Sequence, residues 1–233
     1  MDFLGEGFRR ALSLLLSGNR EVYGIAFLTF KVAVVATAIA CAAGIPTGFL
    51  LATRPFWGRR AALTVVNTAL AFPTVVVGLL LYGLLSRRGP LGGFGWLYTW
   101  QAIVIGDVLL AFPIAAALSA AAVQGVDPRI RRTAETLGAG PWRAAWTVAR
   151  EARFALAAVI TAAFGQTVAE VGAAMIVGGN IRGATRTLTT AVALYAAQGD
   201  FGLALALGVV LLLLALLVNV ALQVLQGRGG SRG

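Results

Sequence analysis

The chain has 233 residues, of which 59% are hydrophobic and 12% are charged, and its mean hydropathy is +0.85. Soluble domains carry about a quarter charged residues, so this composition excludes an ordinary soluble protein. The formal net charge is +10, and a single cysteine (Cys41) without any histidine excludes an internal disulfide and argues against zinc sites and histidine-based acid–base chemistry.

The first 20 residues predict an interfacial helix and not a cleavable signal peptide. Met1–Asn19 mixes acids and arginines among its leucines and has no long apolar core. Its larger apolar side chains fall on or near one helical face, as in helices that lie in the membrane surface. These side chains are Phe3, Phe8, Leu12, Leu15 and Leu16.

Five long apolar segments follow, each exceeding the roughly 18 residues that mark a membrane-spanning helix. They are Val32–Ala52, Ala61–Ser86, Gln101–Gln124, Phe154–Asn180 and Phe201–Gln226. We therefore predict an all-α membrane protein with about five transmembrane helices in one domain over residues 21–226, followed by a tail at 227–233.

Four residues inside the predicted spans are expected to have structural roles. Asp107 and Glu170 are costly in hydrocarbon unless they face a bundle interior, water or a basic partner. A proton or cation relay is one interpretation, but no other ionisable group accompanies them, so helix–helix or subunit contacts are favoured. Pro73 and Pro113 are predicted to kink the second and third spans.

The stretch between the third and fourth spans, residues 125–153, is polar and basic. Asp127 and Pro128 form a typical helix start, and Gly138 and Gly140 are expected to end that helix after about ten residues. A second helix can start at Pro141 and lead back into the membrane.

Arginine distribution predicts the orientation. If residues 125–153 are cytoplasmic, so are residues 53–60 and the C-terminal tail, and these three segments hold 11 arginines against 7 on the opposite side. The positive-inside rule favours this arrangement, with the N-terminus outside. Because the arginines set topology, no nucleic-acid partner is expected.

The segment 178–190 has residues suited to a tetrahedral oxyanion. Its glycines expose backbone N–H groups, its threonines offer hydroxyl donors and its arginines supply charge in a planar fork. Alternatively, the arginines bind lipid headgroups or a partner protein, and the threonines only cap a re-entrant helix. The candidate pathway residues are Gly178, Gly179, Asn180, Arg182, Thr185, Arg186 and Thr187.

Residues 131–148, "RRTAETLGAGPWRAAWTV", resemble the cytoplasmic coupling loop of ABC-importer permeases, whose pattern is E-A-A-x3-G-x9-I-x-L-P. Ala134, Gly138 and Val148 match the pattern. Arg132 stands where glutamate is usual, and Arg150-Glu151 replaces Leu-Pro.

Three further stretches resemble permeases for molybdate and tungstate. They are "ALAFPTVVVG" (69–78), "GPLG" (89–92) and "AEVGAAMIVGGNIRGATRTLTTAVAL" (169–194), and the last is closer to the tungstate branch. The four motifs occur in the expected order, and the resemblance covers nearly the whole chain from about residue 25.

The resemblance implies a type I ABC importer permease fold in a prokaryotic plasma membrane. It implies a homodimer, cytoplasmic ATPase subunits that bind ATP and Mg²⁺, and an extracytoplasmic oxyanion-binding protein. The chain itself has no G-x-x-x-x-G-K-[ST] motif, so it cannot bind ATP in that way. We also expect no cofactor, metal or catalytic residue in it. The residues expected to contact the ATPase are Thr133, Ala134, Glu135, Leu137, Gly138 and Ala139.

Other functions stay open from the sequence. An ABC permease for an amino acid such as methionine would share the coupling loop. A secondary transporter or channel would use Asp107 and Glu170 as an ion relay. An intramembrane enzyme is disfavoured because no nucleophile–base pair or metal-ligand cluster is evident. Tungstate and molybdate have the same charge and nearly the same size, so the sequence does not separate them.

Overall fold

The computed structural model describes residues 5, 8, 9, 12, 13 and 16–227, and its described part is built from helices without strands. Half of the predicted interfacial segment 1–20 and nearly all of the tail lie outside the described residues. The helices are α2 (Arg20–Thr53), α3 (Arg59–Ala69), α4 (Thr74–Leu85), the short 3-10 helix η1 (Gly92–Phe94), α5 (Trp100–Gln124), α6 (Pro128–Thr136), α7 (Pro141–Glu151), α8 (Arg153–Ala169), α9 (Gly172–Gly178), α10 (Leu188–Ala197) and α11 (Phe201–Gly227).

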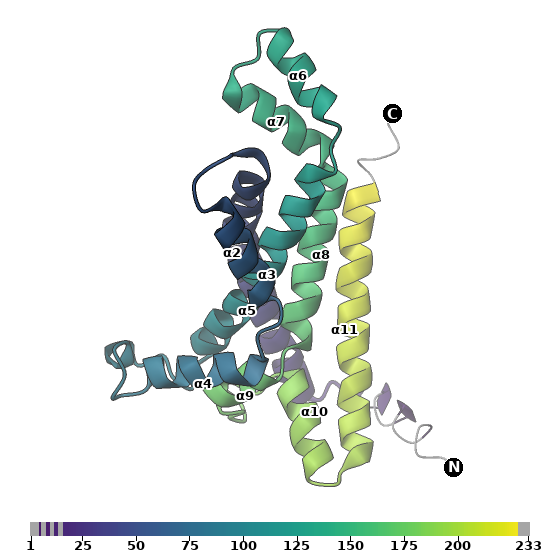
Figure 1. Cartoon of the computed structure of the whole chain (residues 1–233). Coiled ribbons are helices and arrows are strands. Elements are labelled where there is room, and N and C mark those ends of the chain that lie inside the picture. Colours follow the sequence, from purple (N-terminus) through teal and green to yellow (C-terminus); the bar gives the residue numbers. More distant parts are fainter. Residues whose placement is uncertain (1–4, 6–7, 10–11, 14–15, 228–233) are drawn as a thin grey trace.

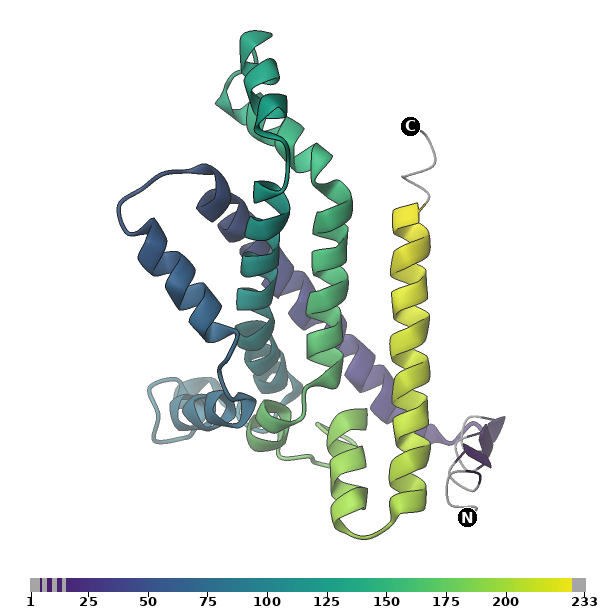
Figure 2. The ribbon, with the colours of Figure 1, turned by 45° about the vertical axis from the view of Figure 1, so that its right-hand side comes forward.

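Three single helices are long and apolar enough to cross a membrane, namely α2, α5 and α11. Two bent pairs, α3 with α4 and α7 with α8, raise the number of spans to five if each pair counts as one. The predicted all-α membrane fold is therefore confirmed, with three to five candidate spans among the described residues. Figures 1 and 2 show α8 and α11 upright and α2 crossing the bundle obliquely.

The second predicted span, Ala61–Ser86, is wrong as a single kinked helix. It breaks at Leu70–Pro73, and the axes of α3 and α4 differ by 102°. Pro73 has no N–H to donate and disfavours helical geometry at the residue before it, so the helix restarts instead of bending. Pro113, by contrast, lies within α5, which continues through it as one helix.

The fourth predicted span, Phe154–Asn180, is also interrupted. Helix α8 ends at Ala169, Glu170 has extended backbone geometry, and α9 starts at Gly172. Glu170 thus lies at a helix break and not inside a continuous span.

Close approach of α2 and α5 holds the centre of the bundle. A Cβ at Gly48 would lie 2.2 Å from the carbonyl oxygen of Ala116, and one at Gly44 would lie 2.6 Å from the Cβ of Ala115. Gly44 and Gly48 are four residues apart on one face of α2, the spacing with which small residues let membrane helices approach closely.

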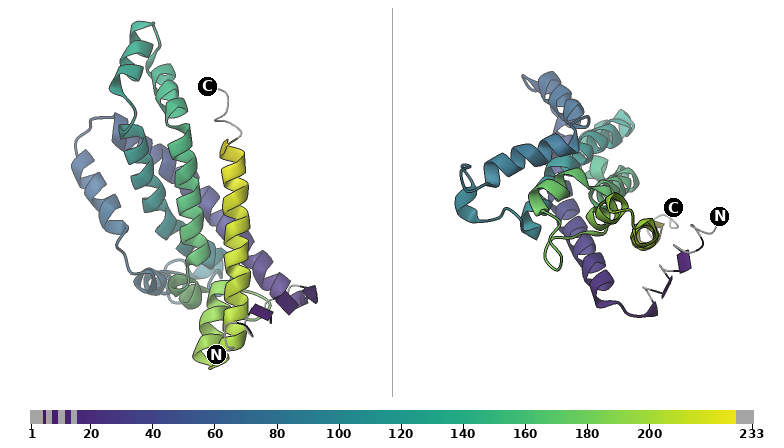
Figure 3. Two further views of the ribbon diagram at one scale, coloured as in Figure 1. Left: turned by 90° about the vertical axis from the view of Figure 1, so that its right-hand side faces the viewer. Right: turned by 90° about the horizontal axis from the view of Figure 1, so that it is seen from below.

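The loops gather at two opposite ends of the bundle. Helices α6 and α7, the α2–α3 loop and the end of α11 lie at one end, at the top of Figure 1, whereas α4, α9, α10 and the start of α2 lie at the other. The views in Figure 3 agree with this division. Residues 53–60 and 125–153, the two fully described segments that the arginine count assigned to one side of the membrane, therefore lie at one end of the molecule.

Candidate functional site

Local capping builds a helical hairpin from α6 and α7. The carboxylate of Asp127 accepts a hydrogen bond from the backbone N–H of Arg129 at 2.8 Å, and Pro128 is the first residue of α6. Gly138 follows the helix with a φ of 83°, in the left-handed region that favours glycine. Pro141 then begins α7, so the helix starts and stops predicted for this loop are confirmed.

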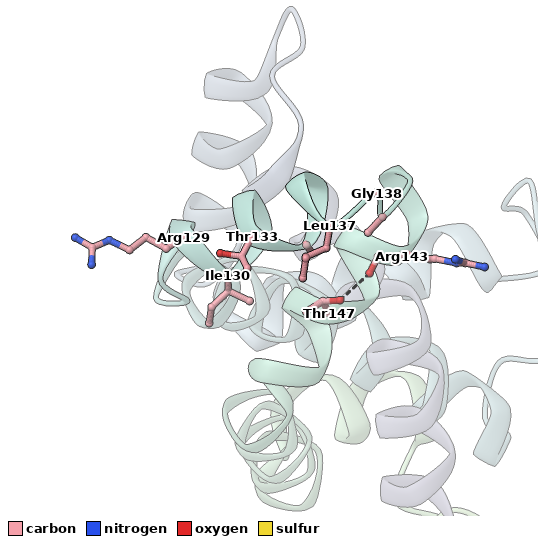
Figure 4. Close-up of a pocket in the computed structure, with 9 residues that line it drawn as sticks. Arg129, Ile130, Thr133, Leu137, Gly138, Arg143 and Thr147 are labelled. Carbon is pink, nitrogen blue, oxygen red and sulfur yellow. Dashed lines mark hydrogen bonds between the residues drawn. The ribbon is translucent and has the colours of Figure 1, made fainter.

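A groove of about 560 Å³ lies between the two helices of this hairpin (Figure 4). Its lining is Arg129, Ile130, Thr133, Ala134, Leu137, Gly138, Ala139, Arg143 and Thr147. This set contains five of the six residues predicted to contact an ATPase. The sixth, Glu135, forms an exposed ion pair with Arg131 at 2.9 Å.

Large apolar side chains remain uncovered on the hairpin. Leu137 is 82% exposed, and Trp142 and Trp146 on α7 are also exposed. Leu137 lines the groove directly beside Gly138 in Figure 4. Large apolar side chains that are exposed together mark a surface that another protein or the membrane covers.

At the opposite end, a glycine-rich turn joins α9 to α10. Gly179, Asn180 and Gly183 all have positive φ, at 71°, 49° and 78°. The hydroxyl of Thr185 closes this turn, because it donates to the carbonyl of Gly178 at 2.6 Å and accepts from the N–H of Ile181 at 2.9 Å.

Thr187 starts α10 through a reciprocal capping box with Thr190. Thr189 donates its hydroxyl to the carbonyl of Glu170 at 2.8 Å, which ties α10 to the break after α8. Thr185 and Thr187 are both buried, at 1% and 4% exposure. Their hydroxyls therefore shape the loop, as the capping alternative for these threonines expects.

The two arginines of this loop share one acidic partner, Glu21 at the start of α2. The Nε of Arg182 lies 2.7 Å from Oε1 of Glu21, and a second short contact makes the pair bidentate. Nη1 of Arg186 lies 4.0 Å from the same carboxylate. This hydrogen-bonded ion pair raises the pKa of Arg182, so its guanidinium stays charged.

Arg186 is the more enclosed of the two arginines. Its side chain is only 12% exposed, whereas that of Arg182 is 72% exposed. It donates from Nε to the amide oxygen of Asn180 at 3.3 Å and from Nη1 to the hydroxyl of Tyr195 at 3.5 Å. The side chain is thus held in place while its charge is only partly compensated.

A groove of about 480 Å³ lies between this loop and α2. It is lined by Arg20, Glu21, Gly24, Ile25, Leu28, Arg182, Gly183, Ala184 and Arg186. Three guanidinium groups face one carboxylate, so the groove has an excess of positive charge. The predicted pathway residues Arg182 and Arg186 do lie together here, whereas the threonines are turned to internal bonds.

The two intramembrane acids differ in their surroundings. The carboxylate of Glu170 accepts a hydrogen bond from the N–H of Ala173 at 2.8 Å, three residues along the chain, and so caps α9. Asp107 on α5 is 2% exposed, and its Oδ1 has no hydrogen-bond partner among the described residues. Among all the residues that the structure describes, no group of three or more His, Cys, Asp or Glu side chains is placed to hold a metal ion.

Three residues towards this end were not expected from the sequence, namely Glu21, Lys31 and Trp100. Glu21 pairs with an arginine 161 positions away, which no local pattern signals. Lys31, the one lysine of the chain, lies with its ammonium 3.7 Å from the ring centre of Trp100. A charged residue at the margin of an apolar run is the signal that could have drawn attention to Lys31.

Comparison with known proteins agrees with these features. The sequence model of a family described as binding-protein-dependent transport system inner membrane component matches residues 44–228. The tungstate uptake system permease protein TupB of Peptoclostridium acidaminophilum is 40% identical over 226 residues, covering 97% of this chain and 99% of that protein. The molybdenum transport system permease protein ModB of Escherichia coli is 32% identical over 173 residues, or 71% and 76% of the two chains.

A solved structure supports the fold. The chain is similar to a chain of a bacterial ABC transporter involved in the import of the acidic polysaccharide alginate, with a TM-score of 0.68. The match covers 95% of this chain and 83% of that one. At 15% identity it shows the arrangement of helices alone.

Proposed function

Because the chain belongs to the family of binding-protein-dependent transport system inner membrane components, we propose that it is the permease subunit of an ATP-driven importer for tungstate, with molybdate as the second candidate cargo. The observation that carries the proposal is the alignment of relatives named as tungstate uptake permeases along almost the entire chain. The excess positive charge of the groove at Arg182 and Arg186 suits a dianion.

The permease works as a homodimer with two ATPase subunits. One chain supplies only about five spans, which is few for a central pathway. The groove between α6 and α7, with the exposed Leu137 at its edge, is where the ATPase docks. ATP and Mg²⁺ bind to that partner, because this chain has no phosphate-binding loop.

Helix α8 connects the two candidate sites. It follows α7 after a bend of 67° at one end and terminates at Glu170 at the other. There the carboxylate of Glu170 caps α9 and its carbonyl accepts from Thr189 of α10. A rigid-body shift of the hairpin, driven by ATP binding in the partner, is therefore transmitted along α8 to the loop that carries Arg182 and Arg186.

The decisive experiment is uptake by the complex in proteoliposomes. The permease, its ATPase and its binding protein are reconstituted, and uptake of tungstate, molybdate and methionine is measured with and without ATP. Oxyanion uptake that requires ATP and an active ATPase supports the proposal. Uptake that follows an ion gradient and survives loss of the ATPase would identify a secondary transporter, and methionine uptake would identify an amino-acid permease.

Charge at Arg186 provides a second test of the oxyanion pathway. Arg186→Glu places a second carboxylate beside Glu21 and should suppress tungstate uptake, whereas Arg186→Lys keeps the charge and should retain much of it. Arg88→Glu is the matched control, because Arg88 is exposed on a different loop and does not line the groove. The affinity of the complex for the binding protein is measured alongside. Normal uptake by Arg186→Glu would exclude Arg186 from the pathway, and uptake lost together with docking would assign it to the binding protein.

A further inference from the structure

Lys31 is a charged residue placed within the first long helix. It lies 11 positions after Arg20, the first residue of α2, which is about 16 Å along the helix axis. The 22 residues from Val32 to Thr53 that follow it are uncharged. An ionisable residue at such a position is costly unless it has a partner or a function.

The partner of Lys31 is an aromatic ring and not an acid. Its ammonium lies 3.7 Å from the ring centre of Trp100, the first residue of α5. The ion pairs found among the described residues join Arg131 to Glu135 and both Arg182 and Arg186 to Glu21, and none of them includes Lys31. A cation over an indole face is stabilised without losing its positive charge, so it stays available to an anion.

Lys31 continues the helix face that lines the positively charged groove. Arg20, Gly24 and Leu28 of α2 line that groove and are four residues apart along the helix. Lys31 follows Leu28 by three residues. Residues spaced in this way lie on one side of a helix. Lys31 is therefore the next position inward from Leu28, on the same side of α2 as the groove, and its side chain is half-buried.

We propose that Lys31, steadied over Trp100, is the next cation that the oxyanion meets after it leaves the groove beside Arg182 and Arg186. This inference rests on the proposed function. Lysine suits the role because its ammonium is a compact point charge on a flexible stem, whereas an arginine fork holds an oxyanion in two places at once. A conduit needs sites that attract its cargo and release it again.

Substitution of Lys31 tests whether its charge is used. Lys31→Met keeps the length of the side chain without the charge and should lower the initial rate of ATP-dependent tungstate uptake about tenfold, whereas Lys31→Arg should stay within about threefold of the wild type. Assembly with the ATPase and the thermal stability of each variant are measured in parallel. Wild-type uptake by an assembled Lys31→Met complex overturns the inference.

Chemical restoration of the charge separates a lost cation from a disturbed fold. Lys31→Cys is made in a Cys41→Ser background and treated with aminoethyl methanethiosulfonate, which rebuilds a side chain that ends in an ammonium. Uptake should recover after this reagent and not after the neutral methyl reagent. Recovery with both reagents, or with neither, overturns the inference.

The reactivity of the thiol in the Lys31→Cys variant distinguishes an anion path from a lipid anchor. A sulfonate-bearing methanethiosulfonate should modify this thiol faster than a trimethylammonium one, and tungstate should slow the reaction. The matched control is Phe30→Cys, one residue away and on the groove that α2 forms with α8 and α11. Equal reactivity towards both reagents in the two variants, without protection by tungstate, would assign Lys31 to lipid.

The labelling experiment also separates this inference from the proposed function. Suppose that the wild-type complex carries no tungstate or molybdate, but that the Lys31→Cys variant still prefers the anionic reagent. That result would refute the cargo and support position 31 as part of a path for another anion. A complex that carries tungstate with equal rates for the wild type and Lys31→Met would support the cargo and refute the role of Lys31.

Discussion

Substitution of Gly138 by alanine isolates the backbone geometry of the α6–α7 hairpin. A Cβ at Gly138 would meet no atom within 4 Å, so the substitution adds no clash. The cost arises from the φ of 83°, a left-handed conformation that disfavours residues with a Cβ by about 1–2 kcal/mol. Gly140, two residues on, is the control, because it is equally open and its φ of −65° and ψ of 168° suit alanine.

A loss of about 1–2 kcal/mol reduces the population of the native hairpin roughly 5- to 30-fold relative to its alternatives. Suppose that the ATPase binds only the native hairpin. If other hairpin conformations dominate in Gly138→Ala, the apparent affinity of the ATPase for this variant falls by about the same factor. If those conformations stay rare, the apparent affinity falls by less. Gly140→Ala should bind as the wild type does, and Gly138→Asn should recover much of the loss because asparagine tolerates positive φ.

The assay is a titration of the purified permease with its ATPase, combined with ATP hydrolysis stimulated by the loaded binding protein. Membrane insertion should stay normal in all variants, since no span is altered. Equal affinity and hydrolysis for Gly138→Ala and Gly140→Ala would show that the positive φ is not needed for docking. If a Gly138→Asp variant also binds the ATPase and supports stimulated ATP hydrolysis normally, the loop serves only to set the membrane topology.

Two further predictions concern packing and orientation. Gly48→Ala forces a Cβ to within 2.2 Å of a carbonyl oxygen of α5, so it should destabilise the protein by about 1–3 kcal/mol and lower its melting temperature in detergent. The control is Gly24→Ala in the same helix, whose Cβ would meet no atom within 4 Å and which should keep the wild-type melting temperature. Equal melting temperatures for the two variants would contradict this account of the α2–α5 contact. The orientation is tested with single cysteines in a Cys41→Ser background. Gly140→Cys should react with an impermeant thiol reagent from the cytoplasmic side, and Ala184→Cys should react from the opposite side. The reverse pattern would overturn the orientation predicted from the arginines.

Features that depend on neighbouring residues could be predicted from the sequence. The apolar segments had to be helical and membrane-bound, because backbone polar groups in lipid must bond within their own segment. The hairpin could be placed to within a few residues, because Asp127, Pro128, Gly138 and Pro141 act through their own backbone geometry and their nearest N–H groups. The arginine count divided the loops correctly between the two ends of the bundle.

The interruptions of two predicted spans depended on the tertiary structure. Hydropathy is averaged over a window of residues, so each of the pairs α3–α4 and α8–α9 reads as one apolar segment. In the structure, α3 and α4 differ in direction by 102° across the break at Pro73. Glu170 became a cap for α9 because the chain breaks beside it, and the apolar residues around it gave no sign of that break.

Which polar groups meet was likewise decided only by the packing of distant helices. The hydroxyls of Thr185 and Thr187 are candidate anion donors in the sequence, but in the folded chain they form hydrogen bonds within the loop and at the start of α10. Arg182 and Arg186, by contrast, line the groove. Glu21 reaches Arg182 from 161 positions away, and Lys31 meets Trp100 only because α2 lies against α5. Hydrophobicity and capping act over a few residues and fix the elements, whereas the charge and shape of a site arise where elements distant in sequence come into contact.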